Sequence, residues 1–185
     1  THRQEAQKRQ KAKYRTGTGP FMAYELLSYH PPPAHLYRHD LESFFWVLAW
    51  FCAVFNPDLH TVGFIPGWHQ NRLQDIGTEK AKFLASYAEI ERVCANTHAT
   101  YMPFITTWIK YLRHILNNAR NASIMEKEQR EGYYELLDGT EDNVPMRPKL
   151  VAYARKKLLQ AREELRDMVT YDVFMEVFAI PVRAL

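Results

Sequence analysis

The chain has 185 residues, of which 46% are hydrophobic and 24% are charged, and its formal net charge is +3. This is the composition of an ordinary globular protein with a core, so it excludes a disordered or low-complexity chain. The longest apolar run, Phe44 to Phe55, is too short to span a bilayer, and we expect no membrane-spanning segment. The two cysteines, Cys52 and Cys94, lie in apolar helical patterns. They are therefore expected to be buried thiols of an intracellular protein, in the cytoplasm or the nucleus.

The positive charge is concentrated in residues 1–15, which carry six basic side chains against Glu5 alone and leave a net charge of −2 for the rest. We expect a basic, mobile tail over residues 1–15 and one helical domain over residues 16–185. Such a tail can bind nucleic acid or an acidic partner. However, its only aromatic residue is Tyr14, so stacking on bases has little support and we do not expect a nucleic-acid partner.

The first half of the domain is predicted to contain a short helix and a long buried one. Residues 16–20 form a turn, and Phe21 to Ser28 can be helical before the three prolines at 31–33 break regular structure. Asp40 suits the N-cap of a second helix, because its carboxylate can accept backbone N–H groups. Residues 41–55 are then apolar all round, which predicts a central helix buried on every side.

The second half shows helical periodicity and no alternating strand pattern, so the predicted fold class is mostly α. We expect a loop over residues 56–77, a helix capped by Thr78 that continues to about Cys94, and another loop over residues 139–148. The remaining predicted helices cover about residues 104–119, 123–137, 150–168 and 171–179.

Two motifs in this order resemble the end of a protein-kinase activation segment and the start of the central helix of a kinase C-lobe. Residues 15–25 read RTGTGPFMAYE, with Tyr24 where kinases usually have the proline of Ala-Pro-Glu, and residues 38–45 read RHDLESFF. The combination is most similar to the fungal-type protein kinase family, which is distantly casein-kinase-like. The resemblance implies a C-lobe-like helical subdomain from the activation segment onward, with the basic tail as part of the activation loop.

The resemblance also implies roles for the first motif. Gly17, Thr18, Gly19, Pro20 and Phe21 would line the platform for a protein or peptide substrate. Thr18 is the residue type found in serine/threonine kinases, where it bonds to the catalytic loop. Thr16 is a candidate phosphorylation site.

Three further residues would have structural roles by the same resemblance. Asp40 would hold the catalytic loop from beneath, and Glu25 would form a buried ion pair with an arginine from a later loop. We take Arg147 as the candidate partner, although no Asp-Pro precedes it as the family pattern requires.

The chemistry of phosphoryl transfer is not expected in this chain. It needs a Gly-rich loop, a strand lysine, a catalytic-loop Asp and Asn, and an Asp that holds Mg²⁺, all of which precede the activation-segment end in kinases. Arg38-His39-Asp40-Leu41 imitates a catalytic loop but lacks its Asn, and Asp75-Ile76-Gly77 comes too late to be the Mg²⁺-binding motif. We therefore predict no catalytic residue and no cofactor bound by this chain. ATP and Mg²⁺ are implied for a full-length family member, and an N-lobe and catalytic loop are the implied partners.

Several alternatives remain open. The chain can instead be a non-catalytic, kinase-derived interaction module, that is, a pseudokinase remnant. A basic-tailed nucleic-acid binder is a weaker alternative. His35 and His39 have zinc-ligand spacing, but prolines 31–33 adjoin them and no further ligand completes a site, so no metal is predicted. An exposed apolar face where the rest of the kinase would pack predicts self-association.

Overall fold

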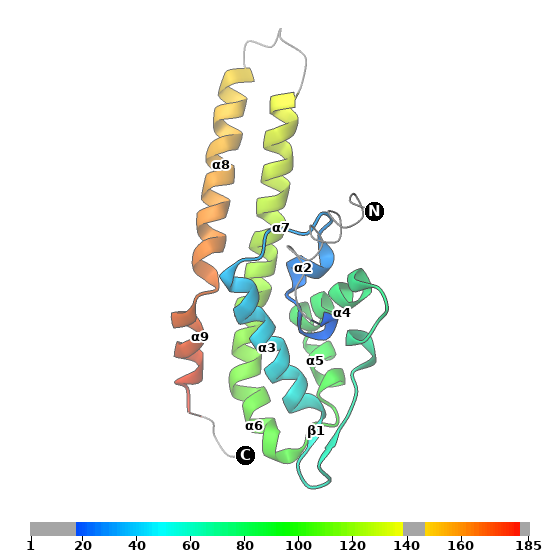
Figure 1. Cartoon of the computed structure of the whole chain (residues 1–185). Helices are drawn as coiled ribbons and strands as arrows, with labels where there is room; N and C mark the ends of the chain where they lie inside the picture. Colours follow the sequence, from blue (N-terminus) through cyan, green and yellow to red (C-terminus); the bar gives the residue numbers. More distant parts are fainter. Residues whose placement is uncertain (1–17, 139–146, 182–185) are drawn as a thin grey trace, which may run out of the picture.

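The computed structural model describes residues 18–138 and 147–181. Its described part is mostly helical (Figure 1), which confirms the predicted fold class. The α-helices are α2 (Tyr24–Ser28), α3 (Tyr37–Val54), α4 (Leu73–Ala85), α5 (Tyr87–Val93), α6 (Met102–Phe104), α7 (Lys110–Asp138), α8 (Arg147–Met168) and α9 (Tyr171–Phe178). Short 3₁₀ turns are η1 (Gly19–Phe21), η2 (Pro66–Trp68) and η3 (Ala99–Tyr101).

The central helix α3 begins four residues earlier than predicted, at Tyr37 instead of Leu41, and Asp40 is not its N-cap. The N-cap is Leu36, whose backbone N–H donates to Nδ1 of His39 at 3.1 Å. The imidazole therefore takes the role that was predicted for the carboxylate of Asp40. Asp40 lies in the first turn of α3 instead, where its negative charge still favours the positive end of the helix dipole.

Helix α3 is buried on one side only, which corrects the prediction that it is buried all round. Phe45, Trp46 and Ala49 lie in the core. Phe44 and Val47, on the other side, are 53% and 43% exposed. Trp46 packs edge-on against Trp68 of η2 at 5.0 Å between ring centroids, so the buried side of α3 is the centre of the core.

The connection after α3 is more ordered than a loop. Strands β1 (Phe55–Asn56) and β2 (Thr61–Val62) pair antiparallel, so the expectation of no strand is wrong at this short hairpin. Helix α4 begins at Leu73 rather than at Thr78, and the hydroxyl of Thr78 donates to the carbonyl of Gln74 inside the helix. A break at Ser86 then separates α4 from α5.

The predicted helices at 104–119 and 123–137 form one continuous element. Helix α6 leads through a π-helical turn, η4 (Ile105–Ile109), into α7 without interruption. Buried Arg113 of α7 donates from Nε to the carbonyl of Phe83 at 2.9 Å, which fastens α7 to the end of α4.

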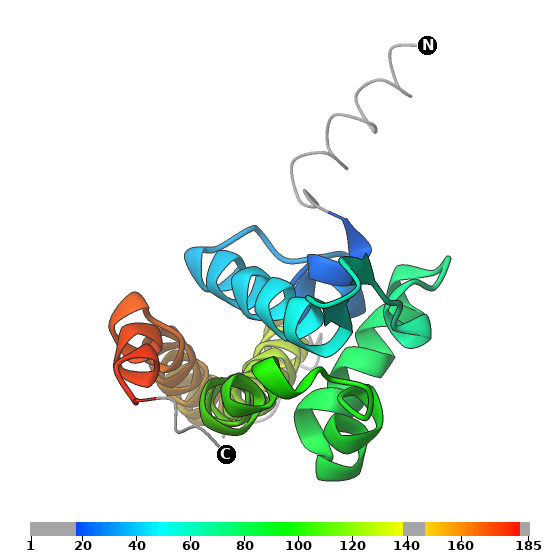
Figure 2. The same cartoon turned by 90° about the horizontal axis from the view of Figure 1, so that it is seen from below.

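Helices α7 and α8 lie antiparallel and rise together well above the other helices (Figure 1). Seen from below, α8 and α9 lie on one side of α7, α4 and α5 lie on the other, and α3 covers α7 between them (Figure 2). Among the described residues, the other helices therefore cover the lower part of the α7–α8 pair and leave its upper part uncovered.

Cys52 and Cys94 are buried and unbonded, which confirms that part of the cysteine prediction. Burial raises the pKa of both thiols to about 11. Within the described ranges, no helix is both long and apolar enough to cross a membrane.

Candidate functional site

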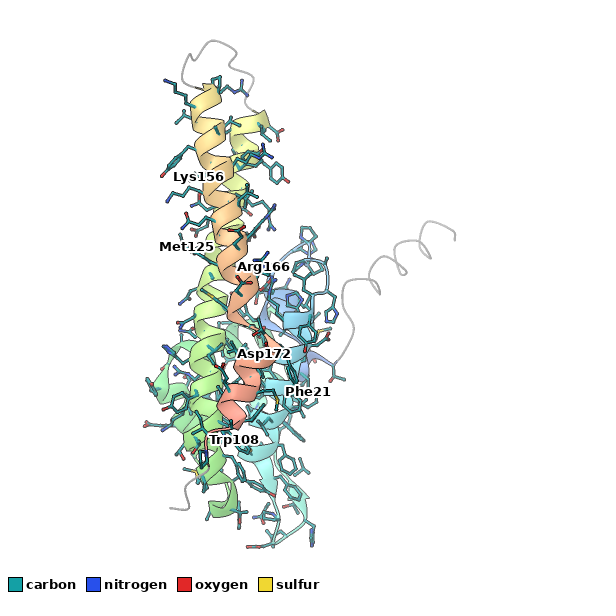
Figure 3. The ribbon with its side chains drawn as sticks, turned by 90° about the vertical axis from the view of Figure 1, so that its left-hand side faces the viewer. Phe21, Trp108, Met125, Lys156, Arg166 and Asp172 are labelled. Carbon is teal, nitrogen blue, oxygen red and sulfur yellow. The ribbon has the colours of Figure 1, made fainter. Side chains whose placement is uncertain are left out.

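The segment from Thr18 to Ser28 packs against α3 and α4. It starts with η1, whose geometry is set by Pro20 and by the Thr18 carbonyl, which accepts the N–H of Phe21 at 2.9 Å. It continues into α2, where Leu26 and Leu27 are fully buried. Figure 3 shows Phe21 on the side of the molecule that carries α3. We call residues 18–28 the docked segment.

Glu25 is the main anchor of the docked segment, and its partner is Arg38 rather than the predicted Arg147. Arg38 donates from Nη2 to Oε2 at 2.8 Å and from Nε to Oε1 at 3.2 Å, a two-point contact. Nε2 of buried His39 faces Oε2 at 3.4 Å. The guanidinium of Arg147 instead donates to the carbonyls of Leu136 and Leu137, near the junction of α7 and α8.

The contacts of Glu25 shift its ionisation. Burial by itself raises the pKa of this carboxyl, but the close contact with His39 and the hydrogen-bonded ion pair with Arg38 outweigh burial and lower the pKa to about 2. Nδ1 of His39 accepts the Leu36 N–H, so the proton of the neutral ring is on Nε2, on the side of Glu25. A single charged carboxylate thus connects the docked segment to the first turn of α3.

A second pair of buried groups, Glu42 and Lys80, fastens the backbone of the docked segment. Oε1 of Glu42 accepts the N–H of Tyr24 at 2.8 Å and the indole N–H of Trp46 at 2.9 Å. Lys80 donates from Nζ to the carbonyl of Met22 and lies 4.5 Å above the Trp46 ring. Burial raises the pKa of Glu42 and lowers that of Lys80, so desolvation disfavours the charge on each group.

Four of the predicted substrate-binding residues, Thr18 to Phe21, lie at the start of the docked segment, at or near the surface. Thr18 is exposed, and its side chain does not cap η1. The backbone of Gly19 approaches α4 closely, since a Cβ there would lie 2.7 Å from Cδ1 of Ile76. Phe21 packs edge-on against Trp50 at 5.6 Å. Thr16 and Gly17, and with them the phosphorylation prediction, lie outside the described residues.

Asp40 begins an open face of α3. Its side chain is 62% exposed and contacts Nε2 of His35 at 3.4 Å. Phe44, Val47 and Phe51 follow it at spacings of four, three and four residues, which place all four on one side of a helix. We call this set the open face; its three apolar members are exposed.

Sequence reasoning missed four of the residues that hold the docked segment. Arg38, His39 and Glu42 lie inside the RHDLES motif but were given no partner. Lys80 follows Ile76 by four residues and precedes Phe83 by three, so it occupies an apolar position of the α4 pattern. A lysine at such a position was the available signal that a buried acceptor faces it.

In the described part of the chain, no three His, Cys, Asp or Glu side chains gather in a way that could hold a metal ion.

Residues 1–52 match the model of the family described as fungal protein kinase. The match covers the docked segment and most of α3, where the two motifs lie. It supports a relation to fungal-type protein kinases for this N-terminal stretch of the chain. No curated protein and no solved structure shows a significant match to the chain.

Proposed function

We propose that the chain is the C-terminal lobe of a serine/threonine protein kinase, which supplies the peptide-substrate platform and the core scaffold for ATP-dependent phosphoryl transfer. In this proposal the chain itself lacks the ATP-binding and catalytic-loop residues. The observation that carries it is the docked segment, because a substrate platform must be fixed on the core helix to position a peptide.

The fixation of that segment is strong for its length. Its main chain is bonded at Tyr24 and at Met22 by buried side chains of α3 and α4, and its one acidic side chain makes a two-point contact with Arg38. Buried charge-assisted contacts of this kind have few alternative arrangements. The residues just before them, Thr18 to Phe21, are thereby presented at one place on the surface.

The open face fits the same proposal. A core helix that leaves Phe44 and Val47 about half exposed is unusual for a complete domain. By the kinase resemblance, Asp40 would hold a catalytic loop, and the apolar residues that follow it would lie beneath the rest of the kinase. The exposed carboxylate of Asp40 has no backbone donor in the described structure, so it remains able to accept N–H groups from such a loop.

The experiment has two arms. The 185-residue chain is mixed with Mg-ATP, and we expect neither a thermal shift nor phosphate transfer to serine or threonine peptides. An N-lobe and catalytic-loop fragment of a fungal-type kinase is then added in trans, and we expect peptide phosphorylation to appear only in the mixture.

Asp40→Asn is the decisive variant of the second arm. It should lower the reconstituted rate by about a hundredfold, because a catalytic loop misplaced by an ångström loses that much. Asp58→Asn is the matched control, since Asp58 is also exposed and also contacts a histidine, His98, at 3.0 Å. Tight Mg-ATP binding by the chain alone, or equal rates for the two variants, would contradict the proposal.

A non-catalytic interaction module is the second candidate function, favoured by the exposed apolar side chains of the rising α7–α8 pair. The coding sequence upstream of residue 1 separates the two candidates. A Gly-rich loop, a strand lysine and a catalytic loop there support the kinase lobe, whereas a start codon without them supports the module.

A further inference from the structure

The upper part of the α7–α8 pair is a two-helix arm, which we define as residues 122–138 and 147–164. The arm rises clear of the other helices, and in Figure 3 Lys156 and Met125 lie on it, above Asp172 of α9. Two helices alone cannot bury apolar residues on both of their faces. Those of the arm that remain exposed are Met125, Tyr134, Leu137, Leu150, Tyr153 and Leu159.

One face of the arm carries a groove between the two helices. It is lined from α7 by Ala122, Met125 and Gln129, and from α8 mainly by Tyr153, Lys157 and Ala161. The groove lies on the side away from the docked segment. Ser123 bonds to the Tyr29 hydroxyl and Lys127 lies over the Tyr29 ring, and a residue two positions from either of them, such as Met125, lies on the opposite side of the helix.

The charges of the arm are divided between its helices. From position 126 to position 138, α7 carries five acidic and two basic residues, whereas from 147 to 157, α8 carries five basic residues and no acidic one. Several of these charges are exposed, including Glu128, Glu135, Lys149, Lys156 and Lys157. Glu128 and Lys149 make no ion pair within the described part of the chain.

We propose that the arm binds the arm of a second copy of this chain, and that the two form an antiparallel four-helix bundle. The division of charge between the acidic α7 and the basic α8 determines which orientation of the two-fold axis is favoured. A two-fold axis parallel to the arm places α7 of each copy over α8 of the other, so acidic faces basic twice. An axis across the arm would place α7 over α7 and acidic over acidic. An acidic peptide would pair only with the basic side chains of α8. A second copy of the chain pairs with the charges of both helices, so it is the occupant that we propose.

The level of each residue along the arm identifies the pairs. Glu126 bonds to Arg162 at 3.0 Å, and Met125 and Gln129 share the groove with Lys157. Because residue 126 is level with residue 162 in this antiparallel pair, Glu128 is level with residue 160, less than one helical turn from Lys157. An axis parallel to the arm preserves these levels. Glu128 of each copy then lies within reach of Lys157 of the other, while Met125 packs over the groove.

The size of the face predicts a weak dimer. A run of 17 helical residues spans about 25 Å, and two adjacent helices are about 20 Å wide. The face is then about 500 Å² per copy, which is about 1,000 Å² in total and near the lower limit for a specific interface. We expect concentration-dependent dimerisation in the micromolar range that weakens at high salt.

Charge reversal of the full chain, followed by sedimentation velocity, tests the proposal. Glu128→Lys and Lys157→Glu should each weaken the dimer by about tenfold, because each reverses two pairs in the symmetric dimer. An equimolar mixture of the two variants should recover wild-type affinity as a heterodimer, since every pair in it again has opposite charges. Recovery in the mixture is specific to α7 facing α8.

Two further variants, one off the arm and one in its groove, show whether a change in dimerisation is specific to the arm. Glu91→Lys on α5 is the matched control, exposed but off the arm, and should not change the dimer. Met125→Asp should weaken it without changing the circular dichroism spectrum. The proposal fails if the wild-type chain remains monomeric at protein concentrations 100-fold above the micromolar range. It also fails if both charge variants dimerise like wild type, or if their mixture does not recover the wild-type dimer affinity.

Discussion

Glu25 and Glu42 are both buried carboxylates that hold the docked segment, yet their pKa values shift in opposite directions. Glu25 receives two N–H groups of the Arg38 guanidinium, so its charge has a cationic partner. Glu42 accepts its hydrogen bonds from neutral donors, the N–H groups of Tyr24 and Trp46, and desolvation outweighs both these bonds and the attraction of nearby Lys80. Because the pKa of Glu25 is lowered and that of Glu42 is raised, Glu25 is the residue whose protonation in acid destabilises the fold.

We expect Glu25→Gln to lower the free energy of unfolding at pH 7 by about 3 kcal/mol, because it removes one member of a buried ion pair. The pKa of Glu25 is lowered to about 2 from an ordinary 4.5. A lowered carboxyl pKa stabilises the fold above the ordinary value, and this stabilisation is lost as the pH falls from about 4.5 to about 2. Urea unfolding at a series of pH values measures both effects.

The difference between wild type and Glu25→Gln should therefore shrink below pH 4.5. Glu91→Gln serves as the control, since Glu91 is exposed, and should match wild type throughout. A difference that stays constant down to pH 2 would show that Glu25 does not carry its charge in the way described.

At the scale of the elements, α2 and α4 approach each other too closely for a side chain at Gly77. A Cβ there would lie 2.4 Å from Oγ of Ser28 and 3.3 Å from Cβ of Leu27. Gly132 in α7 is a helical glycine of the opposite kind, with nothing within 4 Å of its Cβ position. The same substitution at the two sites separates helix propensity from packing.

Gly132→Ala should raise the free energy of unfolding by up to about 1 kcal/mol, which is the propensity gain of alanine in a helix interior. Gly77→Ala should lower it by about 1–2 kcal/mol, because overpacking of about 1–3 kcal/mol exceeds that gain. Ser28→Ala combined with Gly77→Ala should recover most of the loss. Chemical denaturation checks all three, and equal effects at both glycines would disprove the close approach.

The same elements show how much of the fold the sequence can predict. The long amphipathic helix after residue 147 and the short helix before the prolines come from periodicity and turn residues, and both are present. The start of α3 was placed at Asp40 because capping preferences favour a carboxylate, but His39 reaches back to Leu36 instead. The continuity of α7 was missed because polar residues occupy four of the five positions from 117 to 121 and interrupt its apolar pattern.

The candidate site was predictable only in part. The motifs identify the docked segment and α3 as neighbours, but not which cation faces Glu25. Arg38 follows Glu25 by only 13 positions, and the intervening prolines fold the chain back on itself so that the two side chains meet. Such a reversal is a property of tertiary structure. The spacing of Glu25 and Arg38 in the sequence therefore did not predict that Arg38, and not Arg147, would be the partner of Glu25.

At the scale of the whole molecule, the two proposals rest on two separate surfaces of the described residues, the apolar open face of α3 and the mixed apolar and charged groove of the arm. They belong to different elements, and the arm groove lies on the side away from the docked segment. The first is explained by the proposed kinase lobe and the second by the proposed dimer, so variants of each should act independently.

Val47→Lys tests the open face. We expect it to reduce the fluorescence of a bound hydrophobic dye strongly, because it places a charge at the middle of the exposed stripe between Phe44 and Phe51. Stability should hardly change, since an exposed substitution contributes within about 0.5 kcal/mol, or about 2 °C in thermal midpoint for a chain of this size. Leu59→Lys is the control, because Leu59 is 69% exposed and lies outside the stripe.

Glu128→Lys on the arm should leave dye binding unchanged while it weakens the dimer. If dye fluorescence instead falls in Glu128→Lys and stays unchanged in Val47→Lys, the open face must be covered within the chain.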